Sequence, residues 1–270
     1  MKLGLIGCGK MGGALLRGAC KASLVKAKDV MLYDKVPAAI AALQKELPGV
    51  RVAKEPAELA AKSDVVLLAV KPQDMKSLLK SIESSELKSE KALYLSIAAG
   101  ISLKQLESWL GEQARVIRSM PNTPALILHG ASAFARGTKA TDTDVLLAGK
   151  VLGAVGIAQE VPESLLDAVT GLSGSGPAYV YSVIESLADG GVLMGLPRAT
   201  ALQLAAQTVA GAAQMVLQTG KHPAALRDEV TSPGGTTIAG LEQLEKHGLP
   251  NALIQAVRKA TERSKELGAG

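Results

Sequence analysis

Two glycine-rich segments of this 270-residue sequence have the residue types that bind anions through backbone N–H groups. The first, "LIGCGKMGG", spaces Gly7, Gly9 and Gly12 as G-x-G-x-x-G. The second, "TSPGGTTIAG", places Gly234 and Gly235 directly before a helical pattern. The N-terminus of a helix offers free N–H groups and the positive end of the helix dipole. Both segments are therefore candidates for holding a negatively charged molecule.

The first segment has the context of a dinucleotide-binding turn. A strand pattern ends at Ile6, a helix pattern follows the turn, and Asp34 closes the next expected strand 22 residues after Gly12. In this arrangement Gly7 allows the tight turn, Gly9 lets the backbone approach the pyrophosphate, and Gly12 lets helix and strand pack. We therefore expect this turn to bind a nicotinamide dinucleotide.

The residues after the second expected strand favour two different cofactors. Asp34 is able to accept a hydrogen bond from a free ribose 2′-hydroxyl, which favours NADH. Lys35 is able to pair with a 2′-phosphate, which favours NADPH. We expect NADPH, with NADH as the alternative, and the sequence leaves the preference open.

The second segment has the chemistry of a carboxylate site. Gly234, Gly235 and Thr236 would present N–H groups, and each charge-assisted hydrogen bond contributes about 1.5–3 kcal/mol. The hydroxyl of Thr237 would then face a neighbouring polar atom. The alternative is an ordinary helix start that is capped by Ser232 or Thr236.

The strand and helix patterns predict an α/β fold. Apolar strand runs alternate with helical patterns up to about residue 161, which is typical of a Rossmann-type, doubly wound sheet. After Pro162 the strand runs disappear. We expect a dinucleotide-binding domain at 1–161 and an all-α domain for substrate binding and dimerisation at 162–270. The expected strands are 2–6, 30–33, 65–70, 92–97, 115–117, 131–135 and 157–161. The expected helices are 10–21, 38–47, 73–82, 102–109, 142–152, 163–171, 177–194, 198–219 and 236–267, the last broken near residue 248.

The expected helix at 177–194 is apolar on almost every face, and its charged residues are Glu185 and Asp189. Such a helix must be buried, and a small domain buries it most readily against a second copy of the chain. We therefore expect a homodimer formed through the second domain. Burial inside one subunit is the alternative.

The composition and the charge of the chain restrict the kinds of molecule that we expect it to bind. The net charge is +5, and residues 1–160 carry 22 Lys and Arg against 15 Asp and Glu, which favours a small anionic ligand. The basic residues are scattered without an aromatic–basic cluster, so we expect no nucleic acid partner. The uncharged stretch Ala199–Gly220 carries four glutamines on one helical face, so we expect no membrane partner.

The two cysteines, Cys8 and Cys20, give no disulfide framework, which suits the reducing cytoplasm. No cluster of residues has the spacing of metal ligands, so we expect no metal.

Five motifs in order along nearly the whole chain carry a family resemblance. They are "AVKPQ", "SIAAGI", "MPNTPA", "GLSGSGPAY" and "TSPGGTTIAG", of which the last is the most specific. With them the sequence resembles pyrroline-5-carboxylate reductase. The resemblance implies NAD(P)H-dependent reduction of 1-pyrroline-5-carboxylate to L-proline, the last step of proline biosynthesis. It also implies a dimer formed through the helical domain, commonly assembled into rings such as a decamer of five dimers.

The resemblance also implies roles for individual residues. Thr237 lies beside the imine nitrogen, Glu163 is a neighbour of the substrate pocket, and the loops Ala69–Pro72 and Ile97–Ala99 line the cofactor. Asn122 either orients the nicotinamide amide or the substrate, or makes an Asx-turn. Lys71 is expected near the cofactor rather than as a catalytic amine. The candidate cofactor residues are Ile6, Gly7, Cys8, Gly9, Lys10, Met11, Gly12, Asp34, Lys35, Ala69, Val70, Lys71, Pro72, Ile97, Ala98 and Ala99. The candidate substrate residues are Asn122, Glu163, Gly234, Gly235, Thr236 and Thr237, with Thr237 as the catalytic candidate.

The chemistry requires no strong side-chain acid or base. The three histidines, His129, His222 and His247, lie outside the motifs, whereas oxidation of an alcohol needs a base. A cyclic imine takes a proton from water, so the protein need only hold it against the nicotinamide. The 3-hydroxyacid dehydrogenases are similar in plan but have Lys and Asn where this chain has Val180 and Val183. The alternative functions are those of another cyclic-imine reductase, a 3-hydroxyacid-type dehydrogenase, or a dinucleotide sensor that catalyses no reaction.

Overall fold

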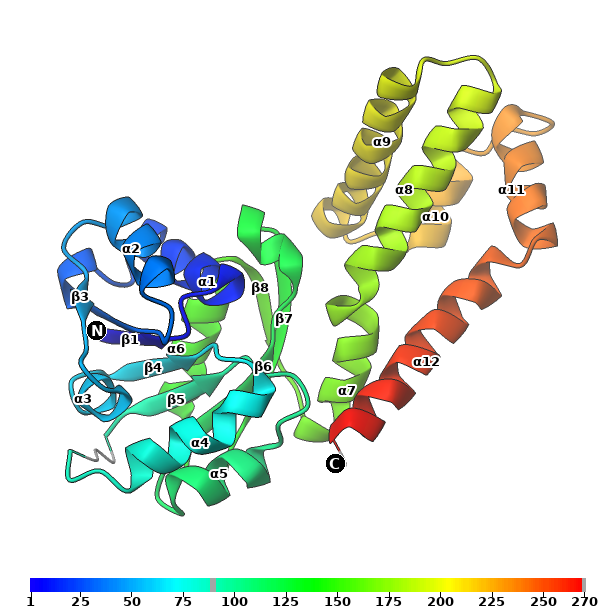
Figure 1. Ribbon diagram of the computed structural model, residues 1–270. Helices are drawn as coiled ribbons and strands as arrows, with labels where there is room; N and C mark the ends of the chain where they lie inside the picture. Colours follow the sequence, from blue (N-terminus) through cyan, green and yellow to red (C-terminus); the bar gives the residue numbers. More distant parts are fainter. Residues whose placement is uncertain (88–90, 269–270) are drawn as a thin grey trace. The chain divides into compact units, whose positions relative to one another are not determined.

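The computed structural model describes residues 1–87 and 91–268, and these residues form two compact units (Figure 1). The sheet unit consists of Met1–Gly174 together with the C-terminal segment from Lys259. The helical unit consists of Ser175–Arg258. Each unit is described separately below.

The sheet unit contains an eight-stranded sheet in the order β3-β2-β1-β4-β5-β6-β7-β8. All neighbouring strands are parallel except β6 and β7, which are antiparallel. The apolar runs of the central strands pack on both faces, as buried parallel strands require. The strands are β1 (Leu3–Ile6), β2 (Val30–Tyr33), β3 (Arg51–Val52), β4 (Val65–Leu68), β5 (Leu93–Ser96), β6 (Arg115–Met120), β7 (Gly130–Arg136) and β8 (Gly156–Glu160).

Helices cover both faces of this sheet, and each face has its own hydrophobic core. Successive strand residues alternate between the cores: Leu5 and Leu67 point to one, Ile6 and Leu68 to the other. The first core includes residues of α1 (Lys10–Lys21), α2 (Pro37–Glu46) and α6 (Asp142–Gly153). The second includes residues of α3 (Pro56–Ala61), α4 (Pro72–Glu83), α5 (Leu103–Leu110) and α7 (Leu166–Val169). This arrangement confirms the expected doubly wound α/β fold.

The helical unit has a small core of its own. Helices α8 and α9 pack through Ala188, Ala201 and Ala205, since small side chains allow close approach. The last turns of α12 belong to the sheet unit, where the Ser264 hydroxyl donates to Asp167 at 2.7 Å. The helices are α8 (Gly176–Leu193), α9 (Arg198–Thr219), α10 (Pro223–Glu229), α11 (Thr236–Lys246) and α12 (Leu249–Gly268).

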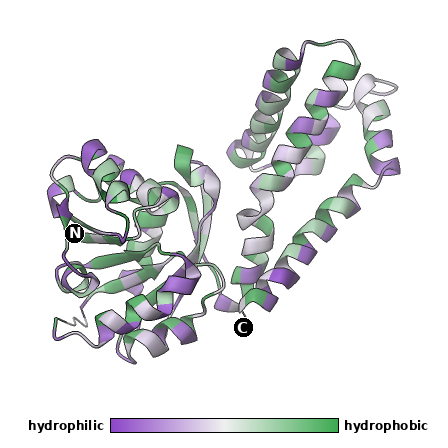
Figure 2. Cartoon of the chain, viewed as in Figure 1, coloured by the Kyte–Doolittle hydropathy of each residue, from purple (hydrophilic) through white to green (hydrophobic). Residues whose placement is uncertain are grey.

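Large apolar side chains remain exposed on the helical unit. Figure 2 shows apolar residues along α8 and α9. Leu193 and Met194 are 84% and 83% exposed, and Tyr181, Leu187, Leu204 and Leu217 are also exposed. Exposed apolar surface of this extent marks an interaction site. This exposure favours the expected homodimer over burial of the 177–194 helix inside one subunit.

Several local expectations differ from the structure. The expected strands and long helices are present, but β3, α3 and α10 were not anticipated. The 163–171 helix is instead a 3-10 turn, the short α7 and a π-helical turn at Thr170–Gly174. The sheet unit runs on to Gly174, because Leu166 packs in the sheet core. The functional domain boundary at 161/162 stays a prediction. Within the described residues, no helix combines the length and hydropathy needed to cross a membrane.

Candidate cofactor and substrate site

The candidate cofactor residues meet at the carboxyl ends of adjacent parallel strands. The loops after β1, β2, β4 and β5 follow neighbouring strands of the sheet. Hydrogen bonds continue the ladder beyond the strand ends: the Gly7 N–H donates to the Tyr33 carbonyl at 2.9 Å, and the Ala69 N–H donates to the Ile6 carbonyl at 2.8 Å. This edge of a doubly wound sheet is where dinucleotides bind.

The glycine turn after β1 permits a close backbone approach. Gly7 has a φ of +100°, and a Cβ on it would lie 2.5 Å from the Ala69 carbonyl carbon. A Cβ on Gly12 would lie 2.3 Å from the Gly7 carbonyl oxygen and 2.9 Å from the Ala69 Cβ. A Cβ on Gly9 would meet nothing within 4 Å. Gly7 and Gly12 are thus fixed by packing, whereas Gly9 faces open space of the kind a pyrophosphate would fill.

Helix α1 begins at this turn without a side-chain cap. Gly9 is the N-cap residue, and no side chain among the described residues accepts a hydrogen bond from the first turn. The first N–H groups of a helix lack partners within the helix, and they attract anions. The turn therefore fits the phosphates of a dinucleotide.

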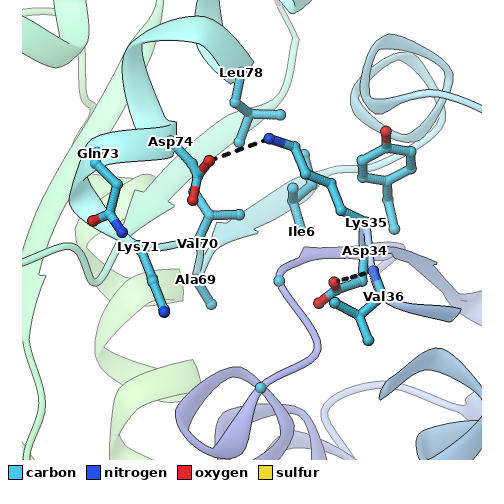
Figure 3. A pocket seen from close by; sticks show the side chains of 13 residues that line it. Ile6, Asp34, Lys35, Val36, Ala69, Val70, Lys71, Gln73, Asp74 and Leu78 are labelled. Carbon is cyan, nitrogen blue, oxygen red and sulfur yellow. Dashed lines mark hydrogen bonds and ion pairs between the residues drawn. The ribbon is translucent and has the colours of Figure 1, made fainter. Parts of the chain in front are cut away.

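A pocket of about 390 Å³ lies beside the turn (Figure 3). Eight of the predicted cofactor residues line it: Ile6, Gly7, Gly9, Asp34, Lys35, Ala69, Val70 and Lys71. Five lining residues were not anticipated: Tyr33, Val36, Gln73, Asp74 and Leu78. The last three lie in α4, which begins at Pro72 inside the "AVKPQ" motif, and Gln73 is the last residue of that motif. Their position in or just after this motif was the signal in the sequence that could have identified them.

Charged side chains occupy the end of the pocket beyond β2. The Asp34 carboxylate accepts hydrogen bonds from the Cys8 N–H at 2.5 Å and from the Val36 N–H at 2.8 Å. The Lys35 ammonium lies 3.2 Å from an Asp74 carboxylate oxygen (Figure 3). Asp34 therefore links the glycine turn to the chain after β2, while Lys35 reaches α4.

The other predicted cofactor residues do not line this pocket. Lys10 is exposed at the first turn of α1, and Met11 packs against the sheet core. Cys8 is buried, and Pro72 starts α4. Ile97, Ala98 and Ala99 follow β5, where the Ile97 N–H donates to the Leu68 carbonyl at 3.1 Å. Their contacts with a cofactor stay predictions.

The buried Cys8 thiol is expected to be unreactive. Burial, and secondarily the Asp34 charge, raise the pKa of this thiol to about 12. Since the thiolate is the nucleophile, Cys8 stays protonated and inert near pH 8. We expect iodoacetamide at pH 8 to leave Cys8 unmodified in the folded protein and to alkylate it in denaturant, as measured by peptide mass spectrometry. Equal alkylation rates in both states would contradict this burial.

Glu163 forms an ion pair within the sheet unit. One of its carboxylate oxygens accepts from Arg118 at 2.9 Å and from the Leu103 N–H at 2.7 Å, at the start of α5. The Arg118 side chain is largely buried. Glu163 lines a second pocket near Arg136 rather than the one beside the glycine turn. The structure therefore gives Glu163 a scaffolding role, and its substrate contact stays a prediction.

Asn122 connects three segments of the sheet unit. Its side-chain nitrogen donates to the Ser173 carbonyl at 2.9 Å, and its side-chain oxygen accepts from the Ala131 N–H at 2.8 Å. The residue is buried, so both polar groups of the amide are satisfied by protein. These bonds fix the π-helical turn against β7 and the loop after β6. The predicted contact of Asn122 with nicotinamide or substrate stays a prediction.

The Gly234–Thr237 segment starts α11 in the helical unit. Gly234 has a φ of +66°, which favours glycine, and Gly235 is the N-cap residue. Among the described residues, no side chain caps α11, so the ordinary cap by Ser232 or Thr236 is wrong. Thr237 is half-buried in the first turn. The free N–H groups of this turn have the geometry of a carboxylate site.

The fold and the glycine turn define a Rossmann-type dinucleotide-binding protein joined to a helical unit. Two family models match the chain: "NADP oxidoreductase coenzyme F420-dependent" over residues 2–100 and "Pyrroline-5-carboxylate reductase dimerisation" over residues 163–267. The pyrroline-5-carboxylate reductase of Methanosarcina acetivorans is 50% identical, covering 99% of this chain and 98% of its own. That of Escherichia coli is 42% identical, covering 98% of each.

Solved structures agree with these sequence relatives. The structure of a pyrroline-5-carboxylate reductase from Coxiella burnetii has a TM-score of 0.91 and 33% identity, covering 98% of each chain. The Plasmodium falciparum pyrroline carboxylate reductase with NADP bound has a TM-score of 0.85 and 34% identity, covering 99% of this chain and 98% of its own. The chain belongs to the pyrroline-5-carboxylate reductase family. The expectations of the family and of an oxidoreductase are confirmed.

Proposed function

We propose that this protein reduces 1-pyrroline-5-carboxylate to L-proline with NADPH, as the last step of proline biosynthesis, and that NADH is an alternative cofactor. The observation that carries the proposal is the 50% identity over nearly the full length of a pyrroline-5-carboxylate reductase. The glycine turn and the uncapped start of α11 support it, because the reaction needs sites for two anionic molecules.

The reaction adds one hydride and one proton across the C=N bond of the ring. A reduced nicotinamide dinucleotide held at the glycine turn after β1 would supply the hydride. We assign the N–H groups of Thr236 and Thr237 to the substrate carboxylate, with Gly234 and Gly235 shaping the turn, since the Gly235 N–H donates to the Ser232 carbonyl at 3.1 Å. We assign the Thr237 hydroxyl to a hydrogen bond with the ring nitrogen, which takes its proton from water. Asn122 and Glu163 stay predicted substrate neighbours, and we assign no metal to the reaction.

The proposal is tested by mixing the purified protein with 1-pyrroline-5-carboxylate and either NADPH or NADH, and following cofactor absorbance. We expect turnover that forms proline, detected by mass spectrometry. A larger cyclic imine with the reduced cofactor and a 3-hydroxy acid with NADP⁺ or NAD⁺, run in parallel, distinguish the two enzymatic alternatives. Tight cofactor binding without turnover of any of the three substrates would refute the proposal that the protein is an enzyme. It would support the alternative of a dinucleotide sensor.

We further propose a cytoplasmic homodimer formed through the helical unit, with a decameric ring as the larger assembly. The match to a dimerisation family over residues 163–267 and the exposed apolar side chains support the dimer. The free thiols of Cys8 and Cys20 are compatible with a reducing compartment. Light scattering after size exclusion distinguishes a mass of two chains from one of ten.

An acidic substitution on α8 should dissociate this assembly. Leu187 is 50% exposed, and burial of a leucine contributes about 1.5–3 kcal/mol, counted twice in a symmetric dimer. We expect Leu187→Asp to weaken association by about a hundredfold or more, measured by analytical ultracentrifugation. Leu146→Asp, at a 67% exposed residue of the sheet unit, is the matched control and should leave the assembly unchanged. Equal effects of the two variants would contradict the assigned surface.

A further inference from the structure

We propose that Asp74 sets the balance between NADPH and NADH by holding Lys35 away from the position of the 2′-phosphate. The proposal rests on the proposed function, since it concerns the cofactor pocket of that reaction. It assigns a role in specificity to a residue of α4 that the sequence motifs did not indicate.

The first step is the place of Lys35. It follows β2, where the ribose of the adenosine half is read in a doubly wound sheet. Lys35 and Lys71 are the cationic residues in the described lining of the pocket. Lys71 is the N-cap residue of α4, after β4 rather than β2. Lys35 is therefore the cation placed to meet a 2′-phosphate.

The second step is the present partner of Lys35. Its ammonium lies 3.2 Å from an Asp74 carboxylate oxygen, across the pocket that both residues line (Figure 3). The side chains of Lys35 and Asp74 are 72% and 41% exposed. An exposed ion pair of this kind contributes little to stability, so Lys35 is able to exchange partners. A bound 2′-phosphate and Asp74 would compete for the same ammonium.

The third step is the fixed charge of Asp34. Its two carboxylate oxygens each accept a backbone hydrogen bond, one from Cys8 and one from Val36. These bonds hold the carboxylate at the end of β2, where it accepts from a ribose hydroxyl and repels a phosphate. Asp34 and Asp74 thus both disfavour NADPH, and only Asp74 acts by occupying Lys35. Removing the Asp74 charge should therefore release the cation that NADPH needs.

The test is calorimetric binding of NADP⁺ and of NAD⁺, which differ only in the 2′-phosphate, to the full-length protein without substrate. Asp74→Asn should tighten NADP⁺ binding about fivefold, the upper end for the release of an exposed ion pair, and change NAD⁺ binding by less than about twofold. Lys35→Met should weaken NADP⁺ binding about tenfold and leave NAD⁺ binding similarly unaffected. Glu46→Gln, which breaks the comparably exposed Arg17–Glu46 pair outside the pocket lining, should change neither.

The double variant decides how Asp74 acts. In the Lys35→Met background, Asp74→Asn should tighten NADP⁺ binding by less than about twofold, because no ammonium remains to be released. The full fivefold gain in that background would show direct repulsion of the phosphate and overturn the proposal. An unchanged ratio of NADP⁺ to NAD⁺ affinity in Asp74→Asn would also overturn it. Failure of the wild-type protein to bind either dinucleotide would instead refute the proposed function itself.

Discussion

Replacing Gly9 by alanine should weaken dinucleotide binding about a hundredfold or more and leave the free energy of unfolding nearly unchanged. A Cβ at this position meets nothing within 4 Å in the protein, so the fold accommodates it. The same Cβ occupies the space through which phosphate oxygens approach the uncapped start of α1. Loss of two charge-assisted hydrogen bonds, each contributing about 1.5–3 kcal/mol, gives the expected factor. Calorimetric binding and urea unfolding of the same preparation measure the two quantities.

Gly7→Ala is the matched comparison within the same turn. Its Cβ would lie 2.5 Å from backbone atoms of Ala69, at a φ of +100°. Backbone atoms cannot move aside as a flexible side chain can, so this variant should lose at least about 2 kcal/mol of stability as well as cofactor affinity. Normal NADPH binding by the Gly9→Ala protein would show that the glycine turn does not bind the phosphates. A Gly9→Ala protein as unstable as Gly7→Ala would show that its binding loss is only structural.

Thr237→Ala should lower kcat about ten- to a hundredfold while leaving KM for the cofactor unchanged. The variant removes one hydroxyl from the first turn of α11 and keeps the backbone N–H groups assigned to the carboxylate. One hydrogen bond to the ring nitrogen contributes about 0.5–1.5 kcal/mol when neutral and about 1.5–3 kcal/mol when the nitrogen is charged. Steady-state kinetics with 1-pyrroline-5-carboxylate, following NADPH absorbance, give the result.

Thr237→Ser is the control, because it keeps the hydroxyl and removes only a methyl group. We expect it to retain most of the wild-type kcat. Undiminished turnover in Thr237→Ala would contradict the assignment of the hydroxyl to the ring nitrogen. Equal losses in the serine and alanine variants would indicate that packing of the methyl group, rather than hydrogen bonding, is what matters at this position.

The local patterns of the chain determined most of the element order. Buried parallel strands such as Val65–Leu68 read as unbroken apolar runs, and long helices such as Arg198–Thr219 show a clear period. Short elements were not predicted from such local patterns. The strand Arg51–Val52 consists of two exposed residues, and the helix Pro56–Ala61 is only six residues long, so neither is long enough to show a period. Local backbone structure in such segments is decided by the strands and helices that surround them.

The geometry of the glycine turn was also evident in the sequence, because turn geometry depends on a few adjacent residues. Gly7, Gly9 and Gly12 occupy the three environments that their spacing predicted. The roles of Glu163 and Asn122 were not evident from sequence, since their partners lie far along the chain. Glu163 is bound to Arg118 and Leu103, and Asn122 to Ser173 and Ala131.

The sequence by itself thus determined the fold class, the family and the two glycine-rich helix starts, because each depends on periodicity or on contiguous motifs. Only the tertiary structure decided which charged residues share the cofactor pocket. Lys35 and Asp74 are 39 positions apart, and they meet because β2 and the start of α4 reach the same edge of the sheet. Pairings between distant residues depend on strand order, which is a property of the whole sheet and is not written in any local segment.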